Sequence, residues 1–288
     1  MRQLLVLLFV SVGTLGCGKL IPNTQNDYNM IYTQQDSLLV LEKRKEFKET
    51  SLDRMSFLLE KIARSFVGSP YKAQTLESGN PESLVINLRE FDCTTFVETC
   101  LALSTTFKMG GYTFDSYQYI LKRIRYRNGY LDGYTSRLHY FTDWISDNSV
   151  IGYVKDVTPL FDGIPFDNQP DYMSTHPEAY PQLAAKPELI GDIKKIEGEI
   201  AAREYFYIPK EALKNTEVYL EEGMIVAFTT NIDGLDVIHT GITTRVEDRM
   251  HLIHASSDAG QVVISKEPLL DYVMNNSLQT GIILLKVE

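Results

Sequence analysis

The hydrophobic pattern changes period along the chain, from helical spacing in the first half to alternation in the last quarter. Apolar side chains recur every three or four residues at residues 52–66, 93–107 and 115–127. From residue 218 onward, apolar and polar positions alternate over five segments, at residues 223–229, 236–245, 250–256, 261–265 and 281–287. Helices followed by a run of antiparallel strands form the element order of the α+β class. We therefore expect N-terminal helices packed on a C-terminal antiparallel sheet or half-barrel.

A proline-punctuated stretch separates the two regions. Prolines recur between Pro159 and Pro187, and residues 188–203 have the pattern of a charged helix. No linker-like stretch bounds this part of the chain, so it does not read as a separate domain. We interpret residues 150–215 as an insertion or lid within a single catalytic domain at residues 46–288.

Residues 1–16 have the organisation of a secretory signal peptide, with a positive residue before an apolar run that is too short to span a membrane. The small residue and Cys17 that close it are similar to a bacterial lipobox, although Thr14 stands where Leu is usual. We expect cleavage and lipidation at Cys17, followed by a polar tether over residues 17–45. The protein would then be exported, lipid-anchored to a membrane of the bacterial cell envelope, and would face the periplasm. Plain cleavage of a secreted protein is the alternative.

The net charge of the 288-residue chain is −10. An acidic surface argues against nucleic acid as a partner and against attachment through anionic lipid headgroups. It leaves open which neutral or cationic ligand binds, and nothing in the sequence indicates the oligomeric state.

A cysteine stands at the predicted start of the helix at residues 93–107. Asp92 precedes Cys93 and can cap this helix, and the unpaired N–H groups of a helix N-terminus favour a thiolate. Cys100 lies seven residues further on, about 10 Å along the helix axis, which is too far for a disulfide. Cys100 is most simply a buried small hydrophobic residue. Cys93 is therefore the candidate nucleophile, with a lowered thiol pKa expected.

Two histidines lie on the predicted strands at residues 236–245 and 250–256. If Val246 pairs with Arg249 in a hairpin, Ile242 faces Ile253, and His239 comes within one diagonal step of His254. Both histidines would then lie on the sheet face opposite the isoleucines, where we expect the helix that carries Cys93. Cysteine early in the chain and histidine late on a strand is the order of a papain-like hydrolase.

At these residues the sequence resembles the NlpC-type cell-wall hydrolases, a papain-like superfamily, and more narrowly its branch of N-acetylmuramoyl-L-alanine amidase-like proteins. The matching segments are Gly68–Tyr71, Leu88–Glu98, Ser136–Tyr140, His239–Ile242 and His254–Ser256. One departure is Glu222-Gly223-Met224, where these families usually have Gly-Asp, a change that concerns a turn more than the chemistry.

The resemblance implies a papain-like, NlpC-type fold and cleavage of the amide between N-acetylmuramic acid and L-alanine in peptidoglycan or its turnover fragments. Cys93 would be the nucleophile, His239 the base and His254 the group that orients His239. The alternatives are a γ-D-glutamyl endopeptidase, which cuts within the stem peptide, and a catalytically silent wall-binding lipoprotein. No cofactor is implied, and no metal-ligand spacing is apparent.

Four further residues are candidates for the substrate groove. Tyr71 and Arg137 either contact substrate or pack within loops, and a guanidinium can hold a carboxylate by two hydrogen bonds. Asp92 is either a helix cap alone or also a substrate contact. His139 is either a substrate contact or a satisfied, half-buried histidine.

Overall fold

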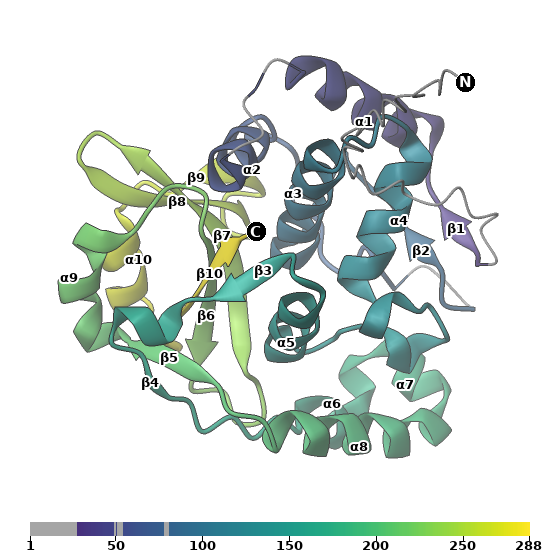
Figure 1. The fold of residues 1–288 in the computed structure, drawn as a ribbon. Helices are drawn as coiled ribbons and strands as arrows, with labels where there is room; N and C mark the ends of the chain where they lie inside the picture. The colour runs from purple at the N-terminus through teal and green to yellow at the C-terminus, as the bar shows by residue number, and fades with distance from the viewer. Residues whose placement is uncertain (1–27, 49, 51–53, 78–80) are drawn as a thin grey trace, which may run out of the picture.

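The computed structural model describes residues 28–48, 50, 54–77 and 81–288. The expected signal peptide, the expected lipidation site Cys17 and the first part of the expected tether lie outside these residues. Helices pack on an antiparallel sheet, as the hydrophobic pattern predicts for the α+β class (Figure 1). Within the described residues, no helix is long and apolar enough to cross a membrane.

The helical layer is built around α3, which packs between α2 and α4 (Figure 1). Its helices are α1 Gln34–Glu46, α2 Met55–Arg64, α3 Cys93–Lys108, α4 Phe114–Arg125 and α5 Phe141–Ile151. The predicted helices at residues 93–107 and 115–127 are confirmed as α3 and α4. The described part of the predicted helix at residues 52–66 forms α2.

The main sheet is antiparallel, with the strand order β4-β5-β10-β6-β7-β8-β9 and with β3 also paired to β10. Its strands are β3 Val154–Asp156, β4 Ile164–Pro165, β5 Phe206–Pro209, β6 Ile225–Thr230, β7 Val237–Val246, β8 Arg249–Ser256, β9 Gln261–Ile264 and β10 Gln279–Val287. The five strands predicted from alternation are confirmed as β6 to β10. A separate pair, β1 Met30–Ile31 and β2 Leu84–Val85, is parallel.

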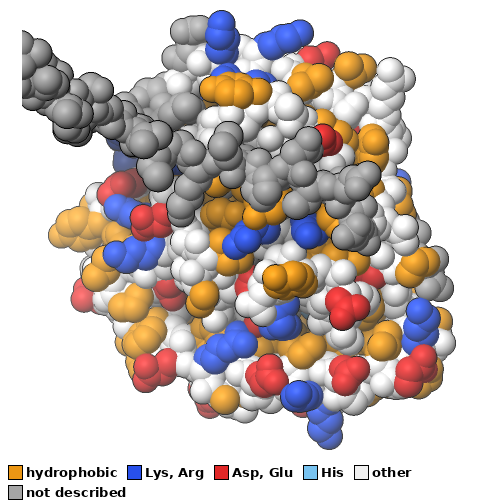
Figure 2. All heavy atoms as spheres, turned by 45° about the vertical axis from the view of Figure 1, so that its right-hand side comes forward, with side chains coloured by type: hydrophobic (Ala, Val, Ile, Leu, Met, Phe, Trp, Pro, Cys, Tyr) orange, Lys and Arg blue, Asp and Glu red, His pale blue; other side chains and the backbone are white. Residues whose placement is uncertain are grey.

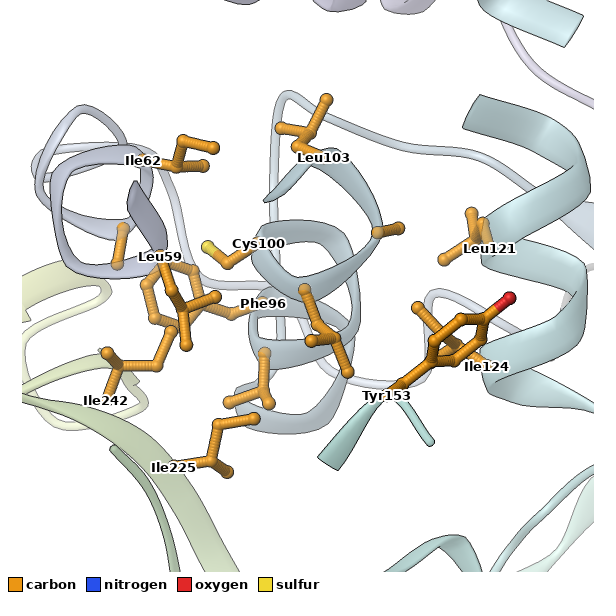
Figure 3. Packing of buried hydrophobic residues seen from close by; sticks show 14 of the residues in the cluster. Leu59, Ile62, Phe96, Cys100, Leu103, Leu121, Ile124, Tyr153, Ile225 and Ile242 are labelled. Carbon is orange, nitrogen blue, oxygen red and sulfur yellow. The ribbon is translucent and has the colours of Figure 1, made fainter. Parts of the chain in front are cut away.

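The two faces of the sheet belong to different hydrophobic clusters. Ile225 and Ile242 point toward the helical layer and pack with Phe96 of α3 and Leu59 of α2 (Figure 3). The opposite face packs against α10, Leu269–Met274, through side chains that include Val226, Leu252 and Leu284. Cys100 is fully buried in the first cluster, as expected for a small hydrophobic residue.

The chain between the helical layer and β6 contains mostly short elements. Its helices are α6 Tyr172–Thr175, α7 Pro181–Ala185, α8 Ile190–Ala201 and α9 Leu213–Thr216. Short 3₁₀ helices occur here and before α5, at Arg127–Gly129, Tyr134–Ser136, Thr158–Phe161, Pro177–Ala179, Pro187–Leu189, Lys210–Ala212 and Glu217–Tyr219. The Tyr140 hydroxyl group donates to Glu197 of α8 at 2.8 Å and accepts the Met173 N–H at 2.9 Å, which ties this stretch to the segment before α5. A lid role for residues 150–215 stays a prediction.

The end of the expected tether is folded against the loop that leads to Cys93. Asp36 of α1 is fully buried and accepts hydrogen bonds from the Leu88 backbone N–H at 2.9 Å and from the Arg89 guanidinium at 3.1 Å. Helix α1 is thereby connected to the approach to α3.

The face over α4 and α8 carries acidic and basic side chains that are interspersed rather than gathered by sign (Figure 2). A mixed surface of this kind produces no strong field of one sign over that part of the molecule.

Candidate active site

Cys93 is the first residue of α3, and Asp92 is its N-cap. The Asp92 carboxylate accepts hydrogen bonds from the Thr95 backbone N–H and hydroxyl group, both at 2.8 Å, while Thr95 Oγ1 accepts the Asp92 N–H at 3.0 Å. This reciprocal capping box fixes the first turn of the helix. The expected cap at Asp92 is therefore confirmed, and its contact with substrate stays a prediction.

The thiol of Cys93 is half-buried and does not have the lowered pKa that we expected from its position. Burial raises the pKa of the Cys93 thiol to about 11, and the Asp92 carboxylate adds to the rise. Hydrogen bonds from Thr94 and Thr240 lower the pKa without offsetting these effects. The expectation considered the helix terminus alone, whereas desolvation disfavours the thiolate more strongly. The side chain is therefore a neutral thiol at neutral pH.

The predicted hairpin has the expected register. Val246 pairs with Arg249 and Ile242 pairs with Ile253, so that His239 and His254 meet. His239 Nε2 lies 2.7 Å from His254 Nδ1, and one of these nitrogens donates its proton to the other. The second ring nitrogen of His239 has no hydrogen-bond partner among the residues that the structure describes.

The expected position of the cysteine helix relative to this pair was wrong. Helix α3 covers the isoleucine face of the sheet (Figure 3). His239 instead packs against Phe228 and Tyr272, which belong to the cluster on the other face. The ladder between β6 and β7 shifts register next to the pair Phe228–His239, which marks a β-bulge at the start of β7. Bulges bend a strand and re-aim its side chains, and they are common beside active sites. His239 thus borders the same cavity as Cys93 from a strand face that α3 does not cover.

The two histidines are surrounded by aromatic rings. His239 stacks on Phe228 with ring centroids 5.6 Å apart. The ring centroid of Tyr272 in α10 lies 6.2 Å from that of His239 and 5.3 Å from that of His254. Burial, together with His254, lowers the pKa of His239 to about 3. Burial also lowers the pKa of His254 to about 4, although the Asp258 carboxylate acts in the opposite direction. Both imidazoles are therefore neutral at neutral pH.

Cys93 and His239 line one cavity of about 130 Å³. Met173 and Tyr180, from the stretch between the helical layer and β6, form part of its wall together with His139. Segments far apart in sequence thus enclose the thiol and the imidazole.

A second cavity of about 260 Å³ adjoins the first, since Thr94, Leu138, His139 and Tyr180 line both. Four of its lining side chains are carboxylates or guanidiniums that pair within the wall: Glu77 with Arg137, and Glu98 with Arg125.

Arg137 lies in the wall of the second cavity, but its charge is already paired. Its side chain is 4% exposed, with Nη2 2.7 Å from Glu77 Oε1 and Nε 3.4 Å from Glu82 Oε1. A guanidinium held by two carboxylates is a weaker receptor for a substrate carboxylate than a free one. The contact of Arg137 with substrate stays a prediction.

His139 is a half-buried histidine with a satisfied ring nitrogen that also borders both cavities. Its Nε2–H donates to the Tyr134 carbonyl oxygen at 2.9 Å. Burial and the nearby Arg137 charge lower the pKa of His139 to about 3, so the ring is neutral. Both predicted roles of His139, as a substrate contact and as a satisfied half-buried histidine, are compatible with this position.

Tyr71 lies near the nucleophile. Its backbone N–H donates to the Gly260 carbonyl oxygen at 2.9 Å. Tyr71 pairs with Phe91 in an isolated parallel bridge, which places it beside the approach to α3. Burial raises the pKa of Tyr71. Tyr71 lines neither cavity, so its place in the substrate groove stays a prediction.

Sequence reasoning missed three residues of this site. Tyr180 lies between two short helices and Tyr272 lies in the short helix α10, and no sequence signal marked either residue. Thr240 directly follows His239 in a matched segment, so its position alone could have singled it out. Within the described residues, no group of three or more His, Cys, Asp or Glu side chains could hold a metal ion.

The fold and the site define an α+β protein with a cysteine at a helix start and a pair of histidines on two neighbouring inner strands of the sheet. The cysteine and His239 line one cavity. The model of the AmiA-like family, described as N-acetylmuramoyl-L-alanine amidase-like, matches residues 61–282. The chain therefore belongs to the AmiA-like family.

Solved structures agree with this assignment. An N-acetylmuramoyl-L-alanine amidase from Bacteroides uniformis is 40% identical, with a TM-score of 0.78 over 81% of this chain and 99% of its own. A Bacteroides fragilis protein, provisionally described as a xylanase, is 41% identical, with a TM-score of 0.75 over 79% of this chain and 100% of its own. A Legionella pneumophila protein with the family model DUF1460 is 22% identical, with a TM-score of 0.66 over 88% of this chain and 94% of its own, a likeness of fold alone. The comparison with curated proteins found no match.

Proposed function

We propose that this protein is a cysteine amidase that cleaves the bond between N-acetylmuramic acid and L-alanine in peptidoglycan or its turnover fragments. The observation that carries the proposal is the convergence of Cys93 and His239 on one cavity, with His254 hydrogen-bonded to His239 at 2.7 Å. The amidase name of the Bacteroides uniformis relative supports the choice of bond. The papain-like, NlpC-type assignment of the fold belongs to the same proposal.

The chemistry follows from the neutral resting state. The raised pKa of the Cys93 thiol and the lowered pKa of His239 keep both groups neutral at rest, so no ion pair forms beforehand. The proton passes from sulfur to the imidazole only as sulfur attacks the lactyl carbonyl carbon. The C–N bond then breaks, and His239 returns the proton to the leaving amine of L-alanine. Water, deprotonated by His239, hydrolyses the thioester and restores the thiol.

Two further groups assist these steps. The backbone N–H of Cys93 is one of the unpaired donors at the start of α3 and is placed to stabilise the oxyanion. His254 holds the ring of His239 and its tautomer through the bond between the two imidazoles. Asp92, Arg137 and His139 line the second cavity and would form walls against which the substrate lies, and Tyr71 is assigned to the same groove.

The anchored location is part of the proposal. Lipidation at Cys17 would hold the enzyme at a membrane of the cell envelope, where peptidoglycan fragments are present.

Mass spectrometry of products identifies the bond. A disaccharide-tetrapeptide incubated with protein that starts at Gly18 is expected to yield free tetrapeptide and bare disaccharide. A disaccharide that still carries L-Ala-γ-D-Glu would replace the amidase by the endopeptidase. Binding of the fragment without any product, in a folded protein, would favour a wall-binding lipoprotein.

A further inference from the structure

A side-chain hydrogen bond joins the strand that carries His239 to the helix that begins at Cys93. Thr240 Oγ1 donates to the Cys93 carbonyl oxygen at 2.9 Å, across 147 positions of sequence. Thr240 is 1% exposed, so water does not compete for this bond. The bond therefore connects the residue beside the base directly to the residue that holds the nucleophile.

The backbone ladder holds this part of β7 on one side only. His239 and Thr240 pair with Phe228 and Ala227 of β6, and the register shifts just beyond the pair Phe228–His239. On the other side, the pairs between β7 and β8 begin only at Ile242, opposite Ile253. The bond from Thr240 to Cys93 therefore adds a constraint to a segment that lies beside a bulge and is paired with one strand.

The alternation of side chains along a strand suits the two residues to different tasks. Thr240 points toward α3, as its bond to Cys93 requires, while His239 points to the face of Phe228 and Tyr272. A contact made by Thr240 can therefore hold β7 against α3 without occupying the imidazole.

We propose that Thr240 is a positioning residue, whose hydroxyl group holds the first turn of α3 against β7 and so sets the separation of the Cys93 thiol and the His239 ring. This proposal rests on the proposed function, in which these two groups exchange a proton. The same residue also acts on the thiol itself, because hydrogen bonds from Thr240 lower the pKa of Cys93.

The same strand offers a matched control. Thr243 is fully buried, and its Oγ1 donates to the Glu221 carbonyl oxygen at 2.7 Å and accepts the Met224 N–H at 2.8 Å. Thr243→Val removes buried hydrogen bonds of similar kind, away from both cavities. The Thr243→Val variant therefore measures how the loss of a buried threonine hydroxyl group changes stability when the site is left intact.

The test compares Thr240→Val, Thr240→Ser and Thr243→Val by steady-state kinetics on a disaccharide-tetrapeptide and by iodoacetamide labelling of Cys93. Thr240→Val is expected to lower kcat about 30-fold with KM changed less than about twofold, because a small misplacement of reacting groups slows chemistry more than binding. Labelling of Cys93 at pH 8 should slow in parallel. Thr240→Ser keeps the hydroxyl group, so its kcat should stay within about threefold of the parent. Thr243→Val should have a lower Tm but an unchanged kcat.

A Thr240→Val protein with parental kcat and labelling rate would overturn the proposal, and so would a loss of kcat in Thr243→Val as large as that in Thr240→Val. If Thr240→Val does not fold, Thr240→Ala removes the hydroxyl group without adding a methyl group, and the same criteria apply. Cys93→Ala distinguishes a failure of the role proposed for Thr240 from a failure of the proposed function. An inactive Cys93→Ala beside a fully active Thr240→Val rejects only the role of Thr240, whereas an active Cys93→Ala rejects the proposed function itself.

Discussion

Replacing His239 by alanine should lower kcat about 10⁴-fold at pH 7, since a positioned base contributes up to about that factor. The structure gives a specific reason. With its pKa raised to about 11, the Cys93 thiol is ionised in only about one molecule in 10⁴ at pH 7 unless a base removes the proton. The residual activity of His239→Ala should therefore rise about tenfold per pH unit between pH 7 and pH 10.

His176 provides the control for this substitution. It is exposed and lines neither cavity, so His176→Ala should keep kcat within about twofold of the parent. A folded His239→Ala protein with a kcat within tenfold of the parent would remove His239 from the mechanism. A flat pH profile of its residual activity would contradict the raised thiol pKa.

Replacing Glu98 by glutamine should lower the free energy of unfolding by about 3 kcal/mol, because it leaves a buried guanidinium without its counter-charge. Glu98 Oε2 lies 2.7 Å from Arg125 Nε, with side chains 2% and 3% exposed. Burial raises the pKa of Glu98, and the nearby Arg125 charge opposes this rise. The pair lies in the wall of the second cavity, so its loss should also disturb the groove.

Glu221 is the matched control, because the Lys286–Glu221 pair has the same 2.7 Å separation but side chains that are 39% and 57% exposed. Glu221→Gln should change the free energy of unfolding by less than about 1 kcal/mol, as for other surface pairs. Urea denaturation of both variants measures the difference. Equal effects from the two substitutions would show that burial does not determine the strength of the Glu98–Arg125 pair.

Local sequence patterns were sufficient to predict the elements that carry the site. The alternation on either side of Glu247-Asp248 predicts the hairpin, its register and the meeting of His239 with His254, because a two-residue connection leaves little freedom in pairing. Capping chemistry likewise predicts the start of α3 at Cys93.

Properties that depend on tertiary packing could not be predicted from local sequence patterns. The sheet face on which α3 packs was mispredicted. The helical layer covers the isoleucine face of β6 and β7, and this choice is made by tertiary packing. The register shift beside His239 leaves no pattern in the sequence. The thiol pKa was mispredicted because the helix terminus is visible in sequence but burial is not. The carboxylates that pair with Arg137 lie more than fifty residues away in sequence, so neutralisation of its charge could not be foreseen.

The central claim is that the Cys93 sulfur carries the muramoyl acyl group during turnover. Acid quenching of the protein within the first turnovers on a disaccharide-tetrapeptide, followed by peptide mass spectrometry, tests it directly. The account predicts an adduct on the Cys93 peptide with the mass of the disaccharide lactyl acyl group, and none on the peptide of Cys93→Ala. An adduct that retains L-Ala-γ-D-Glu, an adduct on another residue, or products that form at an undiminished rate from Cys93→Ala would contradict it.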